Sequence, residues 1–340
     1  MSTSDQSLLD RRHRRIAELA TPLPGSMPYA NVRPLNVPGR FAGSMLLDFL
    51  DSWHPHVGRE EWLKRILEGR IVPASSKTQN TGGTQQPSAG HPVSPDRRVN
   101  AGEQFDHLLP NTVEPAVNAD IQILHEDKDL IVIGKPAPLP MHPGGRFNRN
   151  TLQYFINTVY APESPLMVHR LDANTSGVLV MCRHQSSVQF IQPQFENRTI
   201  DKCYVARVHG QPVEDAFECA RPLQKNPETG AVRPIASDGK GAAALTQFHV
   251  ISRLKDGTSL IRAVPRTGRT NQIRAHLWAL SLPIVGDPAY LPQARLGTNR
   301  TLWPTEAAMC LHAHSITFTN LNGRRQTFTS ALPEWAMPGE

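Results

Sequence analysis

Apolar residues recur at helical spacing in two segments near the beginning of the chain, 44–53 and 58–72. In the second segment Trp62 and Ile66 lie four positions apart on one helix face, and Gly69 follows as a helix stop. This pattern predicts two short helices followed by a strand, which together suit a small α/β domain.

Two polar stretches flank or interrupt this region. Residues 1–38 are rich in proline, serine and arginine and show no sustained period, so we expect a disordered, solvated tail rather than a transit segment or an RNA-contacting arm. Residues 73–97 are poor in hydrophobic side chains and rich in glycine, serine, proline and glutamine, which indicates a long inserted loop. The sequence therefore predicts a tail over 1–38, a small domain over 39–112 that contains the loop, and a large domain over 119–337.

The large domain shows mainly strand-like patterns. Residues 121–136 alternate between apolar and polar, turn at 127–129 and alternate again, which predicts a hairpin. Further strand-like runs occupy 176–182, 201–210, 243–254, 258–265 and 312–320, and helical patterns occupy 187–195 and 271–280. We therefore expect an α+β architecture built on a mostly antiparallel sheet.

The composition favours a soluble globular protein with a polyanionic partner. Hydrophobic residues make up 39% of the 340 residues, and the longest apolar runs are far shorter than a membrane span. Lys and Arg outnumber Asp and Glu by 36 to 30, and the pI is near 9.3. The four cysteines are scattered without a CxxC pair, so we expect no zinc site or other metal site, no disulfides, and a reducing, cytoplasmic location.

The segment MVHRLDANTSGVLVM, residues 167–181, places polar residues between two apolar pieces. If it is extended, Arg170 and Asp172 lie on the same face, and residues 173–177 form a turn into a buried strand. Two interpretations stay open: a surface ion pair at a hairpin corner, or a carboxylate presented for chemistry.

A second polar cluster lies in PRTGRTNQIRAHLWALSLPIVGDPAY, residues 265–290. The segment predicts a helix capped by Thr270 or Asn271, with an apolar stripe of Ile273, Leu277 and Leu280. Basic side chains gather near its N-terminus, where free amides and the helix dipole favour anions, namely Arg266, Arg269, Arg274 and His276. The cluster indicates either a phosphate or carboxylate partner or a solvated basic helix face.

The strand over 201–210 would place Lys202 and Tyr204 on one face, where the tyrosine either packs in the core or stacks on a flat substrate. The chain has no metal-ligand set, GxSxG elbow, GxxxxGK[ST] phosphate loop or GxGxxG fingerprint. These absences exclude several common chemistries and leave one carboxylate, several arginines and an aromatic side chain.

Taken together, the motifs resemble the RluA family of RNA pseudouridine synthases. HRLDANTSG closely resembles the signature of that family, KCYVARVHG the strand that bears its tyrosine, and TGRTNQIRAH with LPIVGDPAY its arginine-bearing motif. ILHEDKDLIVIGKPAPLPMHPGG and CLHAHSITFTN resemble the segments that open and close its catalytic domain, in the right order over about residues 119–335. The upstream segment 44–72, with RRVNAGEQ, more weakly resembles an S4-type RNA-binding domain.

The resemblance implies a pseudouridine synthase fold with a small S4-like α/β domain, acting on structured ribosomal or transfer RNA without a cofactor. It makes Asp172 the catalytic carboxylate, Tyr204 the residue stacked on the target base, and Arg274 the partner of Asp172. Further substrate or RNA contacts are expected from His169, Arg170, Thr175, Lys202, Arg266, Arg269, Asn271 and His276. Asn271 stands where the family usually has histidine, which could change how the helix cap or the RNA backbone is held.

Isomerisation of uridine breaks the N1–C1′ bond and joins C5 to C1′. One carboxylate attacking either ribose C1′ or base C6 suffices, and a stacking tyrosine offsets the roughly 1–3 kcal/mol of stacking that the flipped base loses. Arg170 would fill space beside the extruded nucleotide. A non-catalytic RNA-binding or assembly module on the same fold is the alternative, but such a module has no reason to keep Asp172, Tyr204 and Arg274. We expect a monomer.

Overall fold

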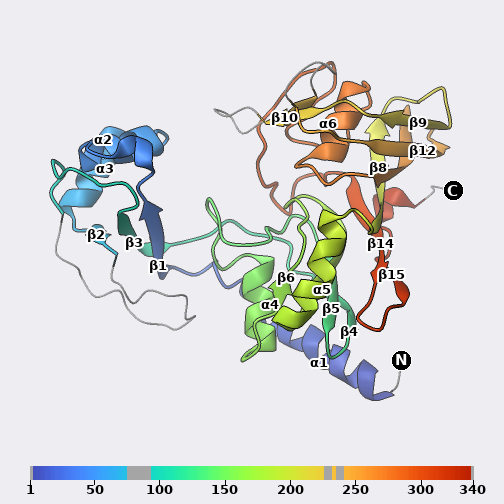
Figure 1. The fold of residues 1–340 in the computed structure, drawn as a ribbon, viewed down its shortest axis with the longest axis horizontal. Coiled ribbons are helices and arrows are strands. Elements are labelled where there is room, and N and C mark those ends of the chain that lie inside the picture. The colour runs from blue at the N-terminus through green and yellow to red at the C-terminus, as the bar shows by residue number, and fades with distance from the viewer. Residues whose placement is uncertain (1–2, 75–92, 226–231, 235–240, 338–340) are drawn as a thin grey trace. The chain divides into compact units, whose positions relative to one another are not determined.

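The chain divides into two compact units, which Figure 1 shows as ribbons. The large unit joins Met1–Pro24 to Glu114–Glu340, and the small unit is Gly25–Val113. The computed structural model describes residues 3–74, 93–225, 232–234 and 241–337. Within these ranges no helix is both long and apolar enough to cross a membrane, and no cluster of three potential metal-ligating side chains occurs.

The large unit is built on a ten-stranded mixed sheet. Its strands are β4 (Gln122–Glu126), β5 (Leu130–Lys135), β6 (Leu166–Met167), β7 (Ser176–Cys182), β8 (Asp201–His209), β9 (Ala216–Cys219), β12 (Thr246–Arg253), β13 (Thr258–Pro265), β14 (Leu311–Thr319) and β15 (Arg325–Thr329). The order is β4-β5-β7-β14-β8-β13-β12-β9, with β15 beside β14 and β6 beside β7. β7 and β14 run parallel and the other described pairs are antiparallel. The expected α+β architecture and the 121–136 hairpin are confirmed.

Helices cover the sheet of the large unit and form two core clusters with it. They are α4 (Leu152–Tyr160), α5 (Gln185–Glu196), α6 (Gln272–Ala279) and the short 3₁₀ helix η2 (Glu334–Ala336). The strands β10 (Leu223–Lys225) and β11 (Val232–Pro234) form a separate two-stranded sheet. One cluster joins β5, β7, α4 and α5, and every residue of β5 is buried, as expected for a strand covered on both faces. The other cluster packs Ile273 and Leu277 of α6 against Phe248 of β12.

The prediction of a disordered tail over residues 1–38 is wrong. Residues Thr3–Leu19 form helix α1, which contacts β4 and α4 (Figure 1). Leu9 and Ile16, seven positions apart on one face, are buried in the core of the large unit. Arg12 donates hydrogen bonds to Glu126, and the backbone N–H of Ile123 in the edge strand β4 donates to His13 Nε2 at 2.8 Å. The helix is held in place because the distant carboxylate of Glu126 accepts from Arg12 and the edge strand β4 donates to His13.

The small unit pairs two helices with a three-stranded sheet. Its elements are β1 (Tyr29–Asn36), the 3₁₀ turn η1 (Gly39–Phe41), α2 (Leu46–Trp53), α3 (Arg59–Leu67), β2 (Ile71–Pro73) and β3 (Gln104–Thr112), with strand order β1-β3-β2. The two helices and the following strand agree with the predicted pattern, and Phe49, Leu50 and Ile66 are fully buried between them. β1 lies inside the predicted tail, so the small unit begins at Gly25 and not at residue 39 as expected. Most of the predicted inserted loop, 75–92 of 73–97, lies outside the described residues.

Candidate active site

A pocket of about 310 Å³ opens where the starts of β7 and α6 face the strand β8. This volume is within the usual range of small-ligand sites, ~300–1,000 Å³. The lining includes most of the residues singled out from the sequence, namely His169, Arg170, Asp172, Thr175, Lys202, Tyr204, Arg269, Asn271 and Arg274. Segments separated by about a hundred residues in the sequence therefore meet at one cavity.

The Asp172 turn, residues 172–175, places the carboxylate at the pocket. The N–H of Thr175 donates to the carbonyl of Asp172 at 3.0 Å, which closes a β-turn just before β7 begins. Gly177 follows with φ +117°, and a Cβ at that position would lie 2.2 Å from the carbonyl oxygen of Ala313 in β14. Only glycine therefore allows β7 to approach β14 here. Ala313 is in register with both Gly177 and Tyr204, so β14 sets the spacing between the Asp172 turn and the tyrosine.

Lys135 holds the Asp172 turn through a hydrogen bond to its backbone. Its ammonium group is fully buried and donates to three carbonyl oxygens, those of Pro136 and Leu139 at 2.9 Å and of Ala173 at 3.2 Å. Burial lowers the pKa of Lys135 to about 7, although the nearby charge of Asp172 opposes the shift. Sequence reasoning missed this residue. The available signal was a lysine at the end of an otherwise apolar strand, followed directly by proline.

Arg274 links Asp172 to a second carboxylate, Asp287. Its Nη1 donates to Asp172 Oδ2 at 3.0 Å, while Nε and Nη2 form a bidentate pair with Asp287 at 2.7 and 2.8 Å. The side chain of Asp287 is completely buried and fixes one side of the guanidinium. The side chain of Asp172 is 27% exposed, so the other side of the guanidinium holds this carboxylate at the pocket. Burial opposes the charged form, but the hydrogen bonds and charge of Asp287, then of Asp172, raise the pKa of Arg274. The sequence motif VGDPAY contained Asp287, but sequence reasoning did not identify its role.

Asn271 occupies the N-cap position of α6 without capping the helix through its side chain. The residue has a left-handed backbone, with φ 53°, and its Oδ1 accepts a hydrogen bond from Arg274 Nη1 at 3.1 Å. The expectation that this side chain caps the helix is therefore wrong, and Asn271 instead shares the guanidinium with Asp172. Asn299 Oδ1 accepts from Nη2 of the same arginine at 3.2 Å, a contact that the sequence did not reveal.

Among the other pocket residues, burial shifts the pKa of three side chains, whereas two arginines are exposed. Burial and the neighbouring Asp172 charge raise the pKa of Tyr204, so its phenol stays protonated. Burial lowers the pKa of Lys202. His169 accepts the N–H of Val180 through Nε2 at 2.9 Å, and burial followed by the charge of Lys202 lowers its pKa to about 3. Arg170 and Arg269 are exposed at the rim.

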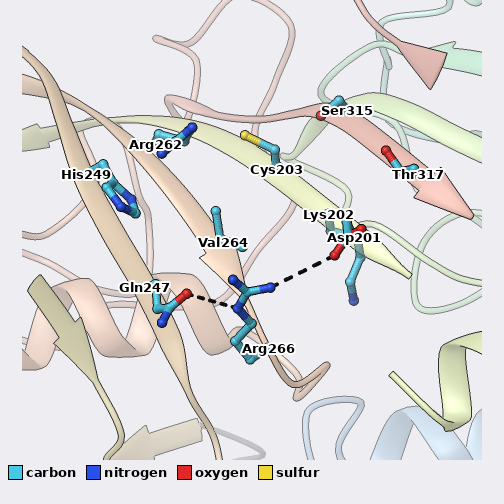
Figure 2. Close-up of a pocket in the computed structure, with 10 residues that line it drawn as sticks. All are labelled: Asp201, Lys202, Cys203, Gln247, His249, Arg262, Val264, Arg266, Ser315 and Thr317. Carbon is cyan, nitrogen blue, oxygen red and sulfur yellow. Dashed lines mark hydrogen bonds and ion pairs between the residues drawn. The ribbon is translucent and has the colours of Figure 1, made fainter. Parts of the chain in front are cut away.

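Two predicted residues lie elsewhere. His276 is fully buried, with Nδ1 2.9 Å from Thr246 Oγ1 and Nε2 3.0 Å from the carbonyl oxygen of Arg221, so the expected RNA contact of His276 is wrong. Arg266 lines a separate depression of about 430 Å³. Figure 2 shows its guanidinium directed toward Gln247 and Asp201. Strand alternation puts this depression on the opposite face of the sheet from α6.

Comparison with known proteins gives consistent matches. Residues 129–279 match the family model described as RNA pseudouridylate synthase. Over 291 residues the chain is 30% identical to an uncharacterised RNA pseudouridine synthase of Synechocystis, covering 85% of this chain and 94% of that protein. An uncharacterised RNA pseudouridine synthase of Bacillus subtilis is 29% identical over 283 residues, covering 81% and 85% of the two chains.

A solved structure has a similar fold over part of the chain. The human protein RNA pseudouridylate synthase domain containing 1 superposes with a TM-score of 0.52 at 23% identity, covering 62% of this chain and 83% of that one. This similarity extends the sequence matches to the arrangement of the mixed sheet.

Proposed function

Because the chain belongs to the RluA-type RNA pseudouridine synthases and is thus an isomerase, we propose that it converts specific uridines of structured ribosomal or transfer RNA to pseudouridine, with Asp172 as the catalytic carboxylate. The observation that carries this assignment is the contact between Asp172 and Arg274. A half-buried carboxylate is held 3.0 Å from a buried guanidinium, at a pocket that also exposes an aromatic ring. Such a pair fixes the orientation of the carboxylate at the pocket.

The pocket supports a simple division of roles. The target uridine leaves its stack, enters the pocket and stacks on Tyr204, whose protonated phenol brings no negative charge near Asp172. Asp172 bonds to ribose C1′ or base C6, the N1–C1′ bond breaks, the base turns, and C5 bonds to C1′. The bond to Asp172 breaks again, either when C5 displaces the carboxylate from C1′ or when the carboxylate is eliminated from C6. C5 then loses its proton and N1 gains one, so the atoms balance without a cofactor.

Recognition of the RNA would come mainly from phosphate contacts. The exposed Arg170 and Arg269 lie at the rim of the pocket, where Arg170 can fill the space that the flipped base leaves. We assign additional RNA contacts to the small unit, whose two helices and three strands are compatible with the S4-like domain that the sequence resembles. Binding that depends on phosphate contacts should weaken steeply with salt.

The direct test is pseudouridine mapping by carbodiimide primer extension on ribosomal and transfer RNA incubated with the purified protein. Asp172→Asn is the matched inactive variant, since Arg274 keeps its bidentate contact with Asp287 and the fold should persist. Asp201→Asn, an exposed aspartate outside the pocket, is the positive control. New stops with wild type and Asp201→Asn, absent with Asp172→Asn, would support the proposal and identify the RNA.

Two results would contradict the assignment. Stops that persist with Asp172→Asn would remove this carboxylate from the reaction. An absence of stops on every RNA, with salt-sensitive binding by all three proteins, would favour the non-catalytic RNA-binding or assembly module.

A further inference from the structure

A loop that follows α6 is hydrogen-bonded to the Asp172 turn and to Arg274. Asn174, inside the Asp172 turn, donates through Nδ2 to the carbonyl of Arg300 at 2.8 Å and accepts the N–H of Leu302 at 2.9 Å. Asn299 of the same loop accepts from Arg274 at 3.2 Å. The residues before Trp303 are therefore held by the Asp172 turn and by Arg274, so the loop 298–306 is anchored to two elements that line the pocket.

The loop presents Trp303 from a rigid base. Leu302, the preceding residue, is buried in the core, whereas the Trp303 side chain is 43% exposed. The N–H of Trp303 donates to Glu306 Oε2 at 2.7 Å, and the carboxylate of Glu306 makes a bidentate pair with Arg300. An exposed tryptophan whose backbone is held on both sides costs little entropy when something stacks on it.

A second fixed loop, 142–150, brings an arginine to the same tryptophan. The buried carboxylate of Glu114 accepts the backbone N–H groups of residues 148, 149 and 150 at 2.8–2.9 Å. Just before the loop, the N–H of Leu139 donates to the carbonyl of Ala173 in the Asp172 turn. The guanidinium carbon of Arg146 lies 5.9 Å from the centre of the Trp303 ring. A loop held by the Asp172 turn and a loop held by Glu114 thus place an exposed aromatic ring and an exposed cation together.

We propose that Trp303 and Arg146 form a stacking subsite for an unpaired base that flanks the target uridine in the RNA. Extrusion of a uridine leaves its neighbours without a stacking partner, and an indole ring can replace that partner irrespective of base identity. Arg146 supplies a positive charge for the adjoining phosphate. The subsite rests on the proposed function, because it needs RNA to enter the pocket at Asp172. It would account for substrate positioning beyond the flipped nucleotide.

The test uses a stem-loop RNA that carries the mapped uridine, with all proteins in the Asp172→Asn background so that binding is measured without turnover. Trp303→Ala should raise Kd by about 5- to 150-fold, the range expected for loss of one base–aromatic stack, and Trp303→Phe should restore most of the affinity. RNA should quench tryptophan fluorescence of the parent, and the quench should shrink in Trp303→Phe. Arg146→Gln should weaken binding and lower the salt slope by about one.

Phe190→Ala is the matched control, because Phe190 is a similarly exposed aromatic residue on α5, 42% exposed. Equal Kd values for Trp303→Ala and Phe190→Ala, or fluorescence that RNA leaves unchanged, would overturn the subsite while mapped pseudouridine leaves the proposed function intact. If mapping finds no modified uridine, the proposed function fails first and the subsite falls with it. Thermal melts should be the same for all variants, which excludes unfolding as the cause.

Discussion

Substitution of Asp287 by Asn tests whether the Asp172 carboxylate is positioned through Arg274. Asn keeps one oxygen for the N–H groups of Ala289 and Tyr290, which donate to Oδ1 at 2.8 and 3.1 Å. The new amide NH₂ then takes the place of Oδ2 and faces the Arg274 Nε–H donor, which is 2.7 Å away in the wild type. A charge-assisted hydrogen bond is thus replaced by two opposed donors in a fully buried site.

The expected cost follows from this geometry. Breaking a buried ion pair costs about 3–5 kcal/mol, and the lower value applies because Arg274 keeps Asp172, Asn271 and Asn299 as partners. About 3 kcal/mol corresponds to a fall in Tm of about 6–12 °C for a unit of this size. A guanidinium released on one side no longer fixes Asp172, and a misplacement of about 1 Å should lower kcat/KM on the order of 100-fold.

Two assays on the same preparations decide the outcome: thermal unfolding by circular dichroism, and release of tritium from RNA labelled at uridine C5, carried out well below the lower Tm. Asp201→Asn is the control, since its exposed pairs with Arg266 and Arg325 should contribute less than about 1 kcal/mol. Wild-type Tm and wild-type turnover in Asp287→Asn would refute the reasoning. A lower Tm with unchanged kcat/KM would show that Asp287 stabilises the fold without positioning the carboxylate.

Further predictions concern the supports of the site. Gly177→Ala should lower the free energy of unfolding by more than about 3 kcal/mol in urea titrations, because the added Cβ meets the backbone of β14. Gly323→Ala, with φ +75° but open space around it, should lower it by about 1–2 kcal/mol. Equal decreases in the two variants would contradict this prediction. Arg12→Ala should lower the free energy of unfolding by about 1.5–3 kcal/mol, because it removes charge-assisted hydrogen bonds to the buried Glu126, which keeps Arg183 and Tyr160 as partners. Arg59→Ala, which loses an exposed pair, should lower it by less than about 1 kcal/mol in the same assay. Between pH 7 and 9 the folded state binds fewer protons at Lys135 than the unfolded chain does, because its folded pKa of about 7 lies below the unfolded value of about 10. The stability of wild type relative to Lys135→Met should therefore rise by about 0.7 kcal/mol per pH unit at pH 7 and by about 1.4 kcal/mol per pH unit near pH 9, and a flat difference would argue against the lowered pKa.

The sequence predicted those elements whose pattern is local. The helices α2 and α3 and the β4–β5 hairpin follow from apolar spacing within a single segment. Helix α1 was missed because its arginines make the segment look solvated, and the carboxylate that accepts Arg12 lies 114 positions away. Periodicity within one window carries no information about such a partner.

The residues of the candidate site also differ in whether the sequence could reveal them. Asp172, Tyr204 and Arg274 were predicted from motifs, and the structure brings them to one pocket, although their chemical roles stay predictions. Lys135 and Asp287 escaped because their importance lies in what they contact, a set of backbone carbonyls and a guanidinium, and neither contact is visible along the sequence. The RNA contact predicted for His276 was wrong, because the residue type suits an anion site but this face of the helix points into the core.

The strand β14 explains why motifs so far apart can form one site. Ala313 pairs with Gly177 of β7 on one side and with Tyr204 of β8 on the other, and its neighbours contribute to both core clusters of the large unit. Asp172 lies in the turn that leads into β7, whereas Arg274 lies on α6, which packs against the β8 side of the sheet. The ion pair therefore bridges two packed halves of the sheet, and its 3.0 Å contact depends on the close approach that Gly177 permits. The glycine of the signature motif thus acts on the carboxylate five residues before it through strand spacing, without touching substrate.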